Sequence, residues 1–176
     1  MDLEQLRTDC AVKQKRGLHI IMASVIIWVA ILCVHLSPLP LLSKNLLTFF
    51  CTAPLLPLSF ALSKLLNIDF QNKANPLTNL GILFSVNQIL YLLIAMWVYP
   101  TVPEKMLMVL AIIFGAHLMP YGWLYKSKVY LVLSVVIPVC ALVIGLNVEP
   151  YILAAVMIFF EVAFCIGLWL ENKQLR

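Results

Sequence analysis

The sequence predicts an all-α membrane protein, a bundle of six transmembrane helices with both termini in the cytoplasm. Its 176 residues are 63% hydrophobic and only 11% charged, whereas soluble domains carry about 25% charged residues. The mean hydropathy is +1.00. The apolar residues fall into six runs, each close to the roughly 20 residues that cross a bilayer as a helix. Little chain remains for a soluble domain, so we expect any activity in the bundle, at its surfaces or with a partner.

Residues 1–17 form a polar N-terminal tail on the cytoplasmic side. Asp2 and Gln5 stand at the spacing of a capping box, and Leu6 and Cys10 recur at helical spacing. This pattern favours a short interfacial helix, and the alternative is a mobile basic tail. We do not expect a signal peptide, because the polar stretch is long and no small-residue cleavage site follows the first apolar run.

Prolines and polar residues set the bounds of the six spans. The first span ends at the turn Ser37-Pro38-Leu39-Pro40, because proline cannot continue a helix. The turn signal Asn75-Pro76 lies in the polar connection before the third span, which itself ends in Pro100 to Pro103. We place the transmembrane domain at residues 18–170 and a cytoplasmic tail at 171–176. The predicted spans are 18–36, 46–66, 80–99, 105–125, 129–146 and 151–170.

The Lys and Arg residues predict the orientation of the bundle, since they accumulate on the cytoplasmic side of membrane proteins. Only Lys44 and Lys105 of the 12 fall on one side. The other ten fall on the side of the two termini, which we therefore place in the cytoplasm: Arg7, Lys13, Lys15, Arg16, Lys64, Lys73, Lys126, Lys128, Lys173 and Arg176.

Four polar side chains share one depth near the middle of the predicted bilayer. Glu161 and His117 each lie nine residues from the inner end of their spans, roughly 13 Å at 1.5 Å per residue. Asn87 and Gln88 lie at a similar depth in the third span. Because a carboxylate in lipid is costly, we expect these residues to point into the bundle and at least two to touch. The most direct expectation is a contact between His117 and Glu161.

Pro120 marks the surroundings of His117 as irregular. A helix proline leaves the carbonyl four residues earlier, here Ala116, without its usual donor. Tyr121 stands four residues after His117 and can share its face. Broken helices beside a binding site have this pattern, and so do kinks that serve only packing. We therefore take Glu161, His117, Asn87, Gln88 and Tyr121 as candidate residues for binding a solute or a proton.

Several chemistries have no basis in the sequence. It contains no GxSxG motif, no HExxH motif and no phosphate-binding loop. The five cysteines show no CxxC spacing, and the three histidines lie at different predicted depths. The basic residues cluster at span ends, which orientation in a bilayer explains without nucleic acid. We therefore expect no catalytic residue, metal, cofactor or nucleic-acid partner.

Four segments carry a resemblance to a known family. They are Asn45 to Phe50 (NLLTFF), Asp69 to Leu77 (DFQNKANPL), Met96 to Tyr99 (MWVY) and Phe114 to Lys128. With these segments the chain resembles, over nearly its whole length, a family of small six-span membrane proteins, chiefly from Gram-positive bacteria, known as a domain of unknown function. The resemblance implies a bacterial plasma-membrane protein, and it implies no activity, ligand or catalytic residue.

These observations favour a membrane protein that binds or moves a small solute or a proton, with Glu161 as the proton or cation site. The alternative is a non-catalytic accessory or assembly subunit, alone or as a homo-oligomer, whose polar layer only fixes helix packing. An intramembrane enzyme is the weakest alternative. Transport predicts that water reaches Glu161, whereas the accessory interpretation predicts a sealed carboxyl.

Overall fold

The structure is a computed structural model that describes residues 2–174. It is all-helical, with 84% of the residues in helices and no strand in this range. Five segments are long and apolar enough to cross a membrane, and a bent pair of shorter helices makes a sixth if the pair counts as one span. In chain order the elements are α1 (Leu3–Lys13), the 3-10 turn η1 (Lys15–Gly17), α2 (Leu18–Leu36), α3 (Leu41–Thr52), α4 (Leu55–Leu65), α5 (Leu77–Thr101), the 3-10 turn η2 (Pro103–Lys105), α6 (Met106–Ala116), α7 (Met119–Leu124), α8 (Lys128–Asn147) and α9 (Pro150–Lys173).

The second apolar run is a bent pair of helices. The pair α3 and α4 meets at an angle of 40°, with the break directly before Pro54 and α4 beginning at Leu55. Proline has no N–H and its ring clashes with the preceding turn, so the helix cannot pass through it undisturbed. The pair also begins earlier than the expected residue 46. It starts at Leu41, and Lys44 fits inside the helix because its ammonium donates to the His35 carbonyl at 3.0 Å.

The fourth apolar run is also interrupted, at the place where Pro120 predicts an irregularity. Helix α6 ends at Ala116 and α7 begins at Met119, so His117 and Leu118 form the break. The two helices still count together as one apolar segment, Pro103–Leu124. The break therefore sets His117 at a discontinuity in the middle of a long helical segment.

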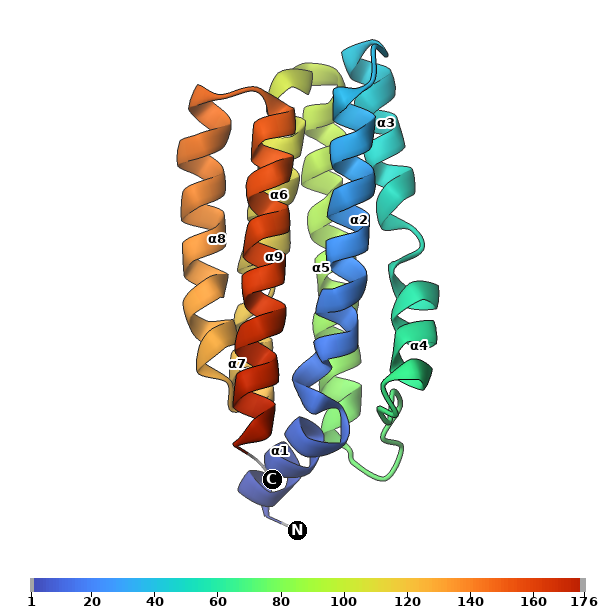
Figure 1. Ribbon diagram of the computed structural model, residues 1–176, viewed down its shortest axis with the longest axis vertical. Coiled ribbons are helices and arrows are strands. Elements are labelled where there is room, and N and C mark those ends of the chain that lie inside the picture. Colours follow the sequence, from blue (N-terminus) through green and yellow to red (C-terminus); the bar gives the residue numbers. More distant parts are fainter. Residues whose placement is uncertain (1, 175–176) are drawn as a thin grey trace.

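Two close helix pairs form the centre of the bundle. Helix α9 packs along α2, and α6 packs along α8. Figure 1 shows α9 and α2 side by side and running in opposite directions. The close approach of α6 and α8 depends on a glycine in each helix. A Cβ at Gly115 would lie 2.7 Å from Pro138, and a Cβ at Gly145 would lie 2.5 Å from Met108. Small residues of this kind let helices approach closely in membranes.

Helix α1 lies across one end of the bundle (Figure 1). The expected capping box is confirmed: Asp2 accepts from the Gln5 N–H at 2.8 Å, and Gln5 accepts from the Asp2 N–H at 3.0 Å. The helix is docked on the bundle. Arg7 donates to the Trp123 carbonyl, and the Asn75 amide donates to the Leu6 carbonyl at 2.8 Å. This segment is thus an ordered helix with contacts to the bundle.

The two ends of the chain are joined at the same end of the bundle. The Arg16 guanidinium is buried and donates to Asn172 Oδ1 at 3.0 Å, with Glu171 Oε2 3.4 Å away. Asn172 in turn donates to the Lys15 carbonyl at 2.9 Å. These contacts connect the beginning of α2 to the end of α9, and we call them the terminal clip. Arg176, which the orientation argument also used, lies outside the described residues.

Candidate functional site

Glu161 is buried between α9 and α2. The residue is 3% exposed, and its Oε2 has no hydrogen-bond partner. The nearby polar group is the Ser24 hydroxyl on the facing side of α2. Ser24 belongs to a face of α2 that also buries Trp28 and His35, as their helical spacing suggests. The carboxyl is therefore sealed within the α2–α9 interface.

His117 occupies the break between α6 and α7. Its ring packs edge-on against Phe114 and Tyr121, with centroids 6.0 and 6.2 Å apart. The contact with Tyr121 confirms that the two residues share a face. The imidazole is half-buried, and its Nδ1 has no hydrogen-bond partner. A buried polar atom without a partner is rare and calls for an explanation.

Asn87 and His117 line the same pocket, which has a volume of about 270 Å³. It lies between α5 and the break after α6. The Asn87 amide donates to the Tyr91 hydroxyl at 2.8 Å, one turn along α5. An amide, a phenol and an imidazole thus meet in one small space. The remaining lining residues are Phe84, Ala116 and Pro120.

Tyr121 fixes α7 to α5 beside this pocket. Its hydroxyl donates to the Gly81 carbonyl at 2.9 Å and lies 2.6 Å from Ser85 Oγ. The side chain is 8% exposed. Tyr121 is therefore bound to α5 rather than directed at a free space, and it holds the two walls of the pocket together.

The expected polar layer is divided between two places. Asn87 and His117 come together, whereas Glu161 lies apart from them and no hydrogen bond or ion pair joins it to His117 in residues 2–174. The expected polar contact between His117 and Glu161 is therefore not found as a hydrogen bond or an ion pair among these residues. Gln88 is half-buried on α5 and does not line the pocket. Equal depth does not guarantee contact, because each side chain also has a direction around its helix axis.

The arrangement is suited to hydrogen bonding with a neutral molecule. The pocket presents donors and acceptors but no carboxylate or ammonium group. In the part of the chain that the structure describes, no group of three His, Cys, Asp or Glu residues is placed to hold a metal ion. Acyl transfer would need a nucleophile beside a base, and the pocket residues do not provide that pair.

Two residues that complete these sites were not among the candidates. Tyr91 stands four residues after Asn87, and this spacing of two polar residues within an apolar run is the signal that indicates it. Ser24 faces Glu161 from a different helix, so only the buried face of α2 hints at its position.

A further polar cluster joins α1 to the loop before α5. Asp9 accepts from Lys13 Nζ at 2.7 Å, from Asn72 Nδ2 at 3.0 Å and from Asn75 Nδ2 at 2.8 Å. These hydrogen bonds, that from Lys13 first, lower the pKa of Asp9 to about 2. The three donors favour the ionised carboxylate, and the cluster fixes α1 to the bundle. We interpret it as a structural contact.

The comparisons with known proteins place the chain by family alone. No curated protein and no solved structure matches it. Residues 3–171, nearly the whole chain, match a family of unknown function. The chain therefore belongs to the family of unknown function DUF7010.

Proposed function

We propose that the protein crosses the plasma membrane six times, with both termini in the cytoplasm, and binds a small neutral solute in the pocket of Asn87, Tyr91 and His117. The observation that carries the proposal is the meeting of Asn87 and His117, from separate helices, at a break in the membrane-spanning segment. Binding sites in membrane transporters are commonly built at such discontinuous helices.

Two observations support the topology. The bias of Lys and Arg toward one side predicts cytoplasmic termini. Helix α1 and the C-terminal end of α9 also lie at the same end of the bundle (Figure 1), as an even number of crossings requires. In this proposal the bent pair α3 and α4 is a single span. Reporter fusions after Lys73 and near Glu104 should locate to the cytoplasm and the exterior respectively.

The chemistry of the pocket defines the solute class. The amide, phenol and imidazole offer donors and acceptors without a full charge, so they suit neutral molecules that form hydrogen bonds. A volume of about 270 Å³ admits only a small molecule. Glu161 is sealed at 3% exposure, and in this proposal it fixes α9 to α2 and is not the proton site.

The experiment measures uptake of urea, acetamide and glycerol into liposomes that contain the purified protein. We expect faster uptake of at least one probe than in empty liposomes, and loss of that difference in Asn87→Leu. Gln88→Leu, one residue along the same helix and outside the pocket, is the matched control and should keep the uptake. Equal uptake by protein-containing and empty liposomes for all three probes would refute movement of a solute through the pocket. Binding itself would be refuted if none of the probes raises the melting temperature of the protein in detergent.

A second candidate function is that of an assembly subunit, and the exposure of α5 favours it. Only 11% of the most apolar stretch of α5 is buried inside the bundle. Asn87 and Ser85 are exposed in the middle of that helix. Polar side chains are costly against lipid, so a partner helix would stabilise them. This function predicts that the protein purifies as an oligomer or complex and that Asn87→Leu releases a monomer. Solute binding predicts no change in mass.

A further inference from the structure

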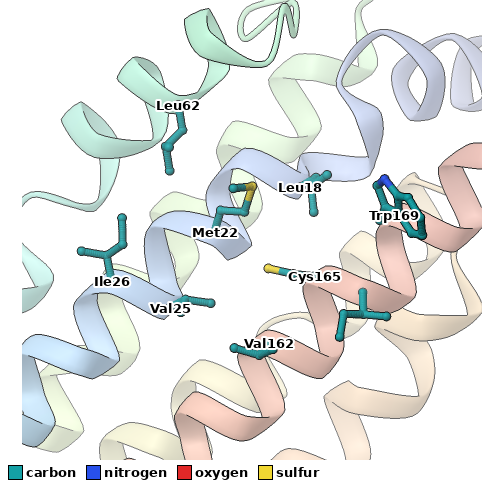
Figure 2. Close-up of a pocket in the computed structure, with 9 residues that line it drawn as sticks. Leu18, Met22, Val25, Ile26, Leu62, Val162, Cys165 and Trp169 are labelled. Atoms are coloured by element: carbon teal, nitrogen blue, oxygen red, sulfur yellow. The ribbon is translucent and has the colours of Figure 1, made fainter.

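An apolar groove lies on the side of the bundle, between α2, α4 and α9. Its volume is about 510 Å³. Figure 2 shows Met22 on α2 and Cys165 on α9 lining the groove, with Leu62 of α4 opposite Met22 and Trp169 at one end. The lining has no polar surface, so we refer to it as the apolar groove.

The dimensions of the groove fit an acyl chain better than a helix. On α2 it runs from Leu18 to Ile26, eight residues or roughly 12 Å at 1.5 Å per residue. A helix about 10 Å wide over that length would need roughly 900 Å³. A methylene group is close in size to a water molecule, whose share of liquid volume is about 30 Å³. At this size the groove has room for roughly 17 methylene groups, the amount of hydrocarbon that a lipid supplies, and not for a whole helix.

Two lysines stand at the end of the groove nearest the chain termini. Lys15 precedes Leu18 by three residues, and its ammonium donates to the Leu66 carbonyl at the end of α4. Lys173 follows Trp169 by one helical turn, and its ammonium lies 3.5 Å from the centre of the indole ring. Each lysine thus continues one wall of the groove toward the aqueous side.

The charge of these lysines is left uncompensated by carboxylates. Within residues 2–174 neither Lys15 nor Lys173 forms a salt bridge. The neighbouring carboxylate, Glu171, is engaged by the Arg16 guanidinium and by the N–H of Val129. Lysines at the cytoplasmic surface attract anionic lipids. The apolar groove matches the acyl chain of an anionic phospholipid, and the two lysines at its end match the negatively charged headgroup.

We propose that the apolar groove binds one anionic phospholipid, with an acyl chain against Met22, Leu62 and Cys165 and the headgroup phosphate at Lys15 and Lys173. The site is separate from the α5 pocket and does not depend on a solute. The assignment of this site to the inner leaflet rests on the proposed topology, whereas retention of the lipid in detergent does not depend on that topology.

The test is native mass spectrometry of the full chain in detergent, with added phosphatidylglycerol or phosphatidylcholine. We expect one phosphatidylglycerol to be retained more firmly than phosphatidylcholine. Lys15→Gln and Lys173→Gln should each reduce its affinity about fivefold. Lys128→Gln is the matched control, because Lys128 is exposed at the start of α8 and does not line the groove. It should leave the affinity unchanged.

A second variant tests the apolar part. Cys165→Phe narrows the groove without changing charge, and it should lower retention of phosphatidylglycerol while the protein keeps its melting temperature within a few degrees. Equal retention of the two lipids, or equal losses in Lys128→Gln and Lys173→Gln, would overturn the site. A dimer mass that Cys165→Phe converts to monomer would also overturn it, because the groove would then hold a second copy of the chain.

Discussion

Replacing Asp9 by Asn should release α1 from the bundle in a measurable fraction of molecules. Asp9 is the only carboxylate that binds both Asn72 and Asn75 among the described residues. Its pKa falls from 3.8 to about 2, and each unit of pKa shift corresponds to about 1.4 kcal/mol. The side chain is 18% exposed, so solvent screening reduces the sum. Lys13, which contributes most to this shift, lies on α1 itself and stays beside Asp9 when α1 undocks, so only the hydrogen bonds from Asn72 and Asn75 count toward docking. We expect a loss of about 1 kcal/mol of docking free energy.

Cys10 provides the assay, because its side chain is fully buried next to this contact. A thiol reagent reaches Cys10 only when α1 undocks, so the labelling rate reports the undocked population. A loss of about 1 kcal/mol predicts labelling roughly fivefold faster in Asp9→Asn. Peptide mass spectrometry separates Cys10 from the other four cysteines. Lys13→Gln is the control, since an exposed pair four residues apart contributes little, and we expect about a twofold change.

The sign of the pH dependence follows from the lowered pKa of Asp9. The stabilisation is fully present above the pKa of about 3.8 for the undocked carboxyl, and it is lost as pH falls through about 2. The ratio of labelling rates between variant and wild type should therefore stay constant from pH 6 to pH 8. A ratio below about three, or a ratio that changes across this range, would refute the role that we assign to Asp9.

Three further predictions concern the bundle. A double-mutant cycle between Ser24 and Glu161 should show coupling, whereas one between His117 and Glu161 should be additive; thermal unfolding in detergent measures both. Gly115→Ala should lower the free energy of unfolding by about 1–3 kcal/mol, because the added Cβ would lie 2.7 Å from the ring of Pro138, which cannot rotate away. An unchanged melting temperature would contradict this packing. Tyr121→Phe removes the hydroxyl contacts to α5 and should lower the free energy of unfolding by about 1 kcal/mol. We expect faster hydrogen exchange in α5, and unaltered exchange would argue against the contact.

The positions of helices followed closely from turn chemistry. The predicted span 18–36 is α2, and its end at Leu36 follows from Pro38 and Pro40. The break before Pro120 was also predictable, because proline acts on the local backbone. The early start of α3 at Leu41 was not, since Lys44 is accommodated by the His35 carbonyl of a different helix. The effect of proline on the backbone can be predicted from the nearby sequence. A hydrogen bond to a residue of another helix cannot.

The candidate site was predictable in depth but not in direction. Counting residues from the span ends puts Asn87, His117 and Glu161 at one level, and the first two meet. Glu161 points toward Ser24 instead, because α9 packs along α2 and the side of α9 that carries Glu161 faces that helix. Neighbour relations between helices depend on packing across the whole bundle, and hydropathy contains no information on them.

The terminal clip has a consequence for how the protein is made. Arg16 is synthesised long before its partners Glu171 and Asn172. A separation of 156 residues from Asn172 means that all the membrane-spanning helices are synthesised before this contact can form. Until then the Arg16 guanidinium has neither of these partners. A chain truncated before residue 171 therefore cannot close the clip, and it leaves the buried Arg16 guanidinium without these two partners.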